Sequence, residues 1–118
     1  MRDHTKLRAF ELADALALAV YRCTSSFPRE EQFGLTSQMR RAAVSIAANI
    51  VEGCARESLN DYIRFLDIAY GSARELEYHI SLARRLTYLT FDGAAMLQSH
   101  SAETSKVLNG LIRALRKE

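Results

Sequence analysis

The stretch that decides the fold runs from Tyr62 to Ala83 and reads YIRFLDIAYGSARELEYHISLA. Apolar or small side chains recur along it in alternating steps of four and three residues. The row consists of Tyr62, Leu66, Ala69, Ala73, Leu76, Ile80 and Ala83. This spacing keeps the row on one side of an α-helix. The stretch is therefore predicted to be a helix that buries this side against other helices.

Three other stretches carry rows with similar helical spacing. The rows are Ala9, Ala13, Leu16, Val20 and Cys23; Met39, Ala43, Ile46, Ile50 and Cys54; and Leu97, Ser101, Thr104, Leu108, Leu111 and Leu115. Together the four stretches predict helices over about residues 7–26, 36–57, 59–87 and 93–116. No strand-type alternation of useful length occurs. The chain is therefore predicted to form one all-α domain over residues 1–118, an up-down antiparallel four-helix bundle.

Local signals support these boundaries. Pro28 ends the first predicted helix, because its ring cannot continue the hydrogen-bond ladder. Ser58 and Asp61 form a capping-box pattern at the start of the third predicted helix. Gly71 lies in the middle of that helix, where it costs about 1 kcal/mol relative to alanine. We expect a neighbouring backbone to pack closely there.

The composition is that of an ordinary globular domain, with 48% hydrophobic and 25% charged residues in 118. The net charge of +2 does not by itself indicate a nucleic-acid partner. Arginine supplies 13 of the 16 basic residues, which favours phosphate or carboxylate partners; the alternative is Arg–Glu pairing on helix faces. Cys23 and Cys54 are expected to be reduced. The longest apolar run, Ala15–Tyr21, is too short to span a membrane, so a soluble cytoplasmic protein is expected.

No pattern in the sequence indicates catalysis, a cofactor or a metal. His4, His79 and His100 are isolated from one another. The di-iron centres of helical bundles require Glu-x-x-His motifs, and this sequence contains none. The five glycines are scattered, so no phosphate-binding loop is present. A non-enzymatic protein is expected.

Two features predict self-association. The first predicted helix is apolar beyond its buried row, and we expect Leu12, Leu18 and Ala19 to contact another copy of the chain. A polar row, Gln38, Arg41, Ser45, Asn49 and Glu52, follows one face of the second predicted helix. Such a row is either a solvated face or a polar contact with another helix or subunit. We assign Asn49 and Glu52 to the interface between copies, and Glu52 is expected to pair with an arginine.

Five arginines are the candidates for binding nucleic acid: Arg40, Arg41, Arg56, Arg84 and Arg85. For Arg84 and Arg85 the alternative is a favourable interaction with the carboxyl end of a helix. The aromatic residues fall mostly at core-like positions, so base stacking is not expected.

Two longer motifs are familiar. They are GLTSQMRRAAVSIAANIVEG at Gly34–Gly53 and FLDIAYGSARELE at Phe65–Glu77. The chain resembles, over about residues 6–115, the bacterial four-helix-bundle proteins encoded in intervening sequences of 23S ribosomal RNA genes. The resemblance implies a ring-like pentamer. A related branch comprises accessory proteins of diversity-generating retroelements, which are basic pentameric barrels that bind a reverse transcriptase and nucleic acid.

The chain departs from this family's pattern at two positions. Ala47 stands where proline is usual, which should leave the second helix straighter. Thr87 stands where glycine is frequent, which is expected to lengthen the third helix slightly.

The function expected from the sequence is that of a non-enzymatic scaffold without cofactors. It is expected to form a homo-oligomer, a pentamer, and to bind RNA or DNA, with structured RNA as the leading ligand. The alternative is a protein–protein interaction scaffold, or a reverse-transcriptase accessory protein without nucleic-acid specificity of its own.

Overall fold

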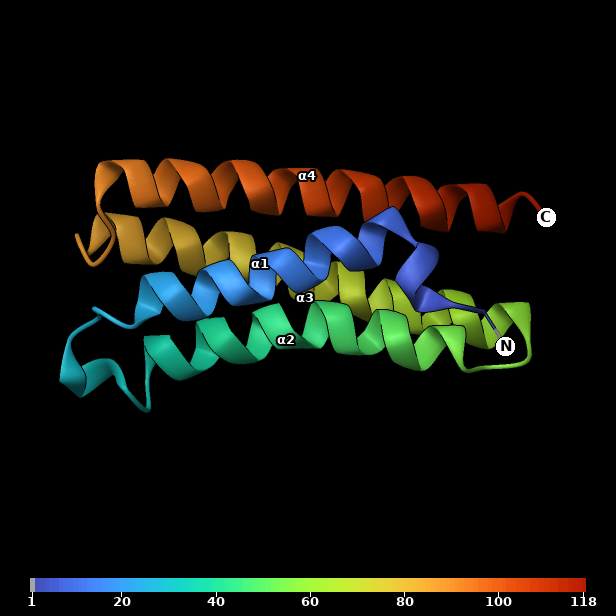
Figure 1. Ribbon diagram of the computed structural model, residues 1–118, viewed down its shortest axis with the longest axis horizontal. Coiled ribbons are helices and arrows are strands. Elements are labelled where there is room, and N and C mark those ends of the chain that lie inside the picture. The colour runs from blue at the N-terminus through green and yellow to red at the C-terminus, as the bar shows by residue number, and fades with distance from the viewer. Residues whose placement is uncertain (1) are drawn as a thin grey trace.

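The computed structural model describes residues 2–118 and contains four long helices (Figure 1). They are α1 (Arg8–Thr24), α2 (Leu35–Cys54), α3 (Leu59–Arg85) and α4 (Phe91–Arg116). Two short 3-10 helices, η1 (His4–Lys6) and η2 (Arg29–Glu31), precede α1 and α2. No strand occurs among residues 2–118, so the prediction of an all-α fold is confirmed.

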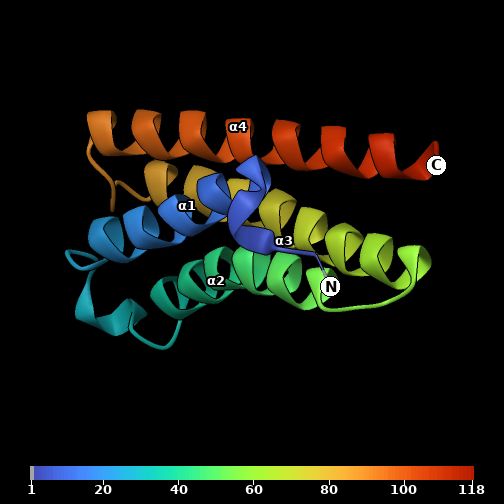
Figure 2. The ribbon, with the colours of Figure 1, turned by 45° about the vertical axis from the view of Figure 1, so that its right-hand side comes forward.

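Each long helix packs against two neighbours. Helices α1 and α3 both contact α2 and α4, whereas in residues 2–118 neither pair of diagonal helices is in contact. Successive helices run in opposite directions, as Figures 1 and 2 both show. The chain is therefore a four-helix bundle, about 45 Å long. We call the end at which α1 and α3 finish, and at which η2 lies, the η2 end (left in Figure 1).

The core is formed by the rows that the sequence predicts. In α3 the buried residues are the seven members of the row between Tyr62 and Ala83. The α4 row behaves differently in its second half: Leu111 and Leu115 are only half-buried, and Ile112 is buried instead. A straight α-helix drifts by about 20° per heptad from a 3.5-residue repeat. Over two heptads this drift moves the buried side of α4 from Leu111 to Ile112.

The end of α3 differs from the expectation that the helix extends to Thr87. Helix α3 ends at Arg85, and Thr87 has a φ of 62°, in the left-handed region. The Thr87 N–H donates to Arg84 O at 3.0 Å, and the Tyr88 N–H donates to Ala83 O at 2.9 Å. This is a Schellman motif, in which glycine is favoured at the left-handed residue. Thr87 therefore terminates the helix as a glycine would, at the cost of backbone strain.

Replacing Thr87 with glycine is expected to raise the free energy of unfolding by about 1 kcal/mol, because glycine adopts positive φ without a clash of its Cβ. Urea unfolding monitored by circular dichroism measures the change. Thr87→Ala is the matched control, since alanine retains the Cβ and should leave stability within about 0.5 kcal/mol. If both substitutions raised the free energy of unfolding equally, the gain would not come from relief of backbone strain at Thr87.

The glycine of α3 does not serve the purpose expected from the sequence. A Cβ at Gly71 would meet no atom within 4 Å, so in the described chain no backbone packs closely there. The close approach is instead at Gly53 in α2. A Cβ there would lie 3.0 Å from Phe65 Cβ and 3.3 Å from Tyr62 O. Helices α2 and α3 therefore approach each other closely at Gly53.

Candidate nucleic-acid interface

A groove of about 650 Å³ lies between α1 and the first half of α2, beside the loop that follows η2. We call it the α1–α2 groove. Its lining residues are Tyr21, Gln32, Phe33, Thr36, Ser37, Arg40, Arg41, Val44 and Ser45. A second hollow of about 360 Å³ adjoins it and shares Gln32, Thr36 and Arg40 with it. The two hollows form one continuous surface that reaches the η2 end of the bundle.

The groove is basic throughout. Arg40 and Arg41 line the larger hollow, and Arg29 joins Arg40 in the smaller one. Neither lining contains an aspartate or a glutamate. The linings of the two hollows together contain three cations and no carboxylate, a local excess of positive charge that the small net charge of the chain conceals. Such a surface attracts anions.

The acidic residue nearest in sequence to the groove is held elsewhere. Glu31 Oε1 accepts a hydrogen bond from the Leu35 N–H at 3.0 Å, and Glu31 Oε2 accepts one from the Tyr88 hydroxyl at 2.8 Å. These two bonds, the Leu35 bond first, hold the pKa of the Glu31 carboxyl below its ordinary value. Glu31 is therefore engaged by the first turn of α2 and by Tyr88, and within residues 2–118 it forms no ion pair with Arg29, Arg40 or Arg41.

Arg40 is held in place by α1. Its Nε donates to Thr24 Oγ1 at 2.9 Å, and its guanidinium carbon lies 4.6 Å from the centre of the Tyr21 ring. The Thr24 hydroxyl in turn donates to Val20 O at 2.8 Å. Because these contacts fix a half-buried side chain, Arg40 presents its remaining N–H groups to the groove with little further loss of conformational freedom.

Arg41 is free to bind a ligand. It is exposed, and it takes part in no ion pair or hydrogen bond of its side chain within residues 2–118. Phe33 lies on the same groove and is 89% exposed. The groove therefore combines a fixed cation, an unpaired cation and a bare aromatic ring.

The other predicted arginines lie apart from the groove lining. Arg56 is at the opposite end of the bundle, where its Nη2 pairs with Glu52 Oε1 at 2.7 Å. Arg84 and Arg85 are exposed in the last turn of α3, at the η2 end, and neither pairs with a carboxylate in residues 2–118. Of the five candidates, two line the groove and two lie at the same end of the molecule.

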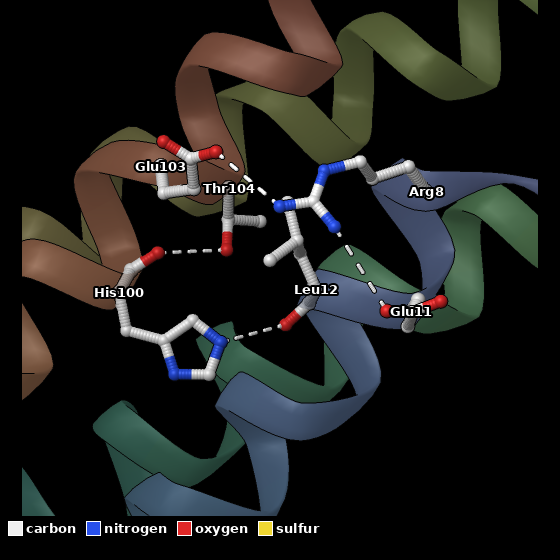
Figure 3. Close-up of polar contacts among 6 residues, drawn as sticks. All are labelled: Arg8, Glu11, Leu12, His100, Glu103 and Thr104. Carbon is white, nitrogen blue, oxygen red and sulfur yellow. Dashed lines mark hydrogen bonds and ion pairs between the residues drawn. The ribbon is translucent and has the colours of Figure 1, made fainter.

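The residues predicted at the interface between copies have different environments. Leu18 points outward from α1 and is 52% exposed. Ala19 is half-buried against the core. Leu12 lies at the contact of α1 with α4, where its carbonyl accepts a hydrogen bond from His100 Nε2 at 3.1 Å (Figure 3). Of these three, Leu18 offers the largest exposed side chain for a contact with another copy.

An ion pair accompanies this contact between α1 and α4. Arg8 Nη2 lies 3.5 Å from Glu103 Oε1, and Arg8 Nη1 lies 3.9 Å from Glu11 Oε1 (Figure 3). All three side chains are largely exposed, so these pairs contribute little to stability. The Arg8–Glu103 pair joins the start of α1 to the middle of α4, whereas the Arg8–Glu11 pair lies within α1.

Several side chains of the polar row of α2 make hydrogen bonds or ion pairs within the single chain. Asn49 Nδ2 donates to Ser45 O at 2.8 Å and to Ser45 Oγ at 3.0 Å, and Ser45 Oγ lies 2.9 Å from Ser72 Oγ of α3. Glu52 pairs with Arg56 at 2.7 Å, but both side chains are exposed in the single chain, so this is not the buried pair that the sequence suggested. Of these bonds, the one between Ser45 and Ser72 links α2 to α3, and a role of Asn49 and Glu52 between copies stays a prediction.

The histidines and cysteines of the described residues do not form a metal site. No group of three or more His, Cys, Asp or Glu among residues 2–118 could hold a metal ion. His79 pairs with Glu75 at 2.9 Å. Cys23 and Cys54 carry free thiols, and burial raises the pKa of both. Within the same residues, each helix is either too short or too polar to cross a membrane.

Comparisons with known proteins show the family of the chain and a similar solved structure. The model of the family described as "23S rRNA-intervening sequence protein" matches residues 5–110. A solved structure of a protein of unknown function, from the S23 ribosomal protein family of Bacteroides thetaiotaomicron, is 28% identical with a TM-score of 0.79. The alignment covers 88% of this chain and 97% of that one. Among curated proteins none matches the chain. Since the family model spans most of the bundle, the chain belongs to the 23S rRNA-intervening sequence protein family.

Proposed function

We propose that the protein is a non-enzymatic, self-associating scaffold that binds nucleic acid, with structured RNA as the leading ligand, through the α1–α2 groove. The observation that carries this proposal is the lining of the groove and of the hollow that adjoins it, which together contain Arg29, Arg40 and Arg41 and no carboxylate. Each contact between an arginine and a phosphate releases condensed counterions, which drives binding at low salt. One guanidinium group can also donate two parallel hydrogen bonds to two oxygens of the same phosphate, which makes the contact directional as well as attractive.

The arrangement of the bundle supports a larger basic surface. Arg84 and Arg85 are exposed in the last turn of α3, at the η2 end, and Arg29 of the smaller hollow lies in η2 itself. In an assembly of several copies, the same small patch recurs once in each copy. A polymer such as RNA can contact several patches at once, and its affinity then exceeds that of a single patch.

Replacing Arg41 with glutamine tests the groove directly. The salt dependence of binding to a fluorescent single-stranded RNA is measured by anisotropy, starting at about 50 mM salt. We expect log K to fall with log salt, and Arg41→Gln to reduce the slope by about 0.7, the contribution of one phosphate contact to a single strand. Arg113→Gln is the matched control, because Arg113 is exposed on α4, which does not contact α2.

Two results would contradict the proposal. If the parent protein binds neither RNA nor DNA at about 50 mM salt, nucleic-acid binding is excluded. If Arg41→Gln and Arg113→Gln change the slope equally, the attraction arises from the net charge of the whole surface and not from the groove.

Self-association is the second part of the proposal, and exposed apolar side chains support it. Leu18 on α1 and Met96 on α4 are 52% and 44% exposed. Tyr78 on α3, which lies on another helix of the bundle, is 58% exposed. A closed ring requires two different surfaces that bind each other. The bundle offers candidates for both, and we propose a pentamer.

The alternative function is a protein-interaction scaffold or a reverse-transcriptase accessory protein. It is favoured by the same exposed apolar side chains, because a different protein could cover them as well as a second copy. Under this alternative, the protein would bind its partner protein but would show no salt-dependent affinity for nucleic acid.

A further inference from the structure

Phe33 is the most exposed large apolar residue of the described chain. It is 89% exposed, and it lies in the segment between η2 and α2, directly before Gly34, the residue at the start of α2. An exposed phenylalanine contributes nothing to the core of the single chain. Its ring instead forms part of the wall of the α1–α2 groove. A fully solvated aromatic ring on a concave surface calls for a ligand that covers it.

The ring lies on the same groove as two guanidinium groups. Arg40 and Arg41 are consecutive near the start of α2, and both line the hollow that Phe33 lines. Tyr21 contributes a second ring, on which Arg40 is stacked at 4.6 Å. Flat aromatic faces beside cations are the elements with which proteins hold single-stranded nucleic acid, because every base offers a π-face and every nucleotide a phosphate.

We propose that the α1–α2 groove binds one unpaired nucleotide of a nucleic-acid strand, with its base stacked on Phe33 and its phosphate held by Arg40 and Arg41. The proposal rests on the proposed function and specifies it: the ligand is an unpaired stretch of the strand, not the surface of a duplex. The volume of about 650 Å³ is within the range of small-ligand pockets, about 300–1,000 Å³.

The polar side chains of the groove fit this ligand. Gln32, Thr36 and Ser37 line it alongside the arginines and supply donors and acceptors for the edge of a base or the hydroxyls of a sugar. In a duplex the faces of the bases are covered by their neighbours, so only phosphates could reach the groove and Phe33 would stay bare. Unpaired loops and bulges of RNA expose base faces for stacking.

The test uses a single-stranded RNA that carries 2-aminopurine, whose fluorescence falls on stacking. With the full chain we expect quenching on binding, and we expect Phe33→Ala to abolish the quenching and to weaken affinity by about 5- to 100-fold. Phe33→Tyr should restore both, because a ring is retained. Phe91→Ala is the matched control: Phe91 is 88% exposed at the start of α4 and lines neither hollow.

Further measurements distinguish an unpaired nucleotide from other ligands that the groove could bind. A fully paired RNA hairpin stem should bind more weakly than the single strand and should be insensitive to Phe33→Ala. Single-stranded DNA of the same sequence tells whether the sugar hydroxyls contribute. Light scattering should give the same particle mass for Phe33→Ala as for the parent protein.

Three results would overturn the inference. If Phe33→Ala binds and quenches as the parent does while Arg41→Gln weakens binding, the groove contacts phosphates only and the proposed function stands without stacking. If Phe33→Ala changes the particle mass, Phe33 contacts another copy of the chain. If the parent binds no nucleic acid at all, the proposed function fails first and the inference fails with it.

Discussion

Replacing Leu66 with alanine is expected to lower the free energy of unfolding by about 3 kcal/mol. Leu66 is the second of the seven residues in the buried row of α3 and is 0% exposed. The loss combines the transfer free energy of the removed atoms with the cost of the cavity that remains. Since small domains are stable by only about 5–15 kcal/mol, this single change removes a large part of the total.

The matched control for Leu66 lies two residues further along the same helix. Ile68 is 44% exposed and lies outside the buried row, so Ile68→Ala should cost less than about 1 kcal/mol. Urea unfolding at one fixed protein concentration measures both variants, because self-association makes apparent stability depend on concentration. Similar losses for the two variants would contradict the assignment of the core to the predicted row.

Replacing Leu18 with glutamate is expected to convert the assembly into single chains. In the bundle Leu18 is 52% exposed, so the single chain tolerates a carboxylate there. In an apolar contact between copies the same carboxylate would be buried without a partner, which costs several kcal/mol for each interface. Light scattering should give five times the 13.3 kDa of one chain for the parent protein and 13.3 kDa for the variant.

The control for Leu18 adds the same charge elsewhere. Asn60 is exposed in the first turn of α3, at the end of the bundle opposite to η2. Glutamate is favourable in a first helical turn, and Asn60→Glu should leave the particle mass unchanged. A parent protein of 13.3 kDa in dilute buffer would refute self-association. A Leu18→Glu variant that keeps the mass of a larger parent would place the interface elsewhere.

The helices were predictable because their buried rows are periodic. The row from Tyr62 to Ala83 coincides with the buried side of α3, since a long helix between two neighbours buries one continuous side. In α4 the same reasoning misplaced the last part of the row, because a straight helix drifts from the heptad spacing, so that Ile112 is buried instead. The end of α3 was also misplaced, since no pattern reveals that Thr87 adopts a positive φ.

The groove was predictable only in part. Arg40 and Arg41 were identified as an adjacent pair of cations, but Arg29, Tyr21 and Phe33 were not selected. These three come from the loop and from α1, and they meet α2 only because the chain folds back after Pro28. An aromatic residue in a loop carries no periodic signal, so the sequence gives no indication of whether its ring is buried or bare. The exposure of the Phe33 side chain is therefore known only from the structure.

The spacing of the arginines along α2 shows the same limit. Arg40 and Arg56 lie 16 residues apart, which corresponds to roughly 24 Å along a helix. A single small groove cannot use both, and in the structure Arg56 pairs with Glu52 at the far end. Arg40 and Arg56 are alike as residue types in the sequence, but the fold places them far apart.

The most direct measurement of the central claim is ultraviolet crosslinking of the assembled protein to single-stranded RNA, followed by trypsin digestion and mass spectrometry. Trypsin cleaves after Arg29 and Arg40 and therefore releases the segment 30–40, which contains Phe33. We predict that the crosslinked RNA is found on this segment and on the segment that contains Tyr21. Crosslinks found only on α3 or α4, with none on residues 21–45, would contradict the α1–α2 groove as the binding site.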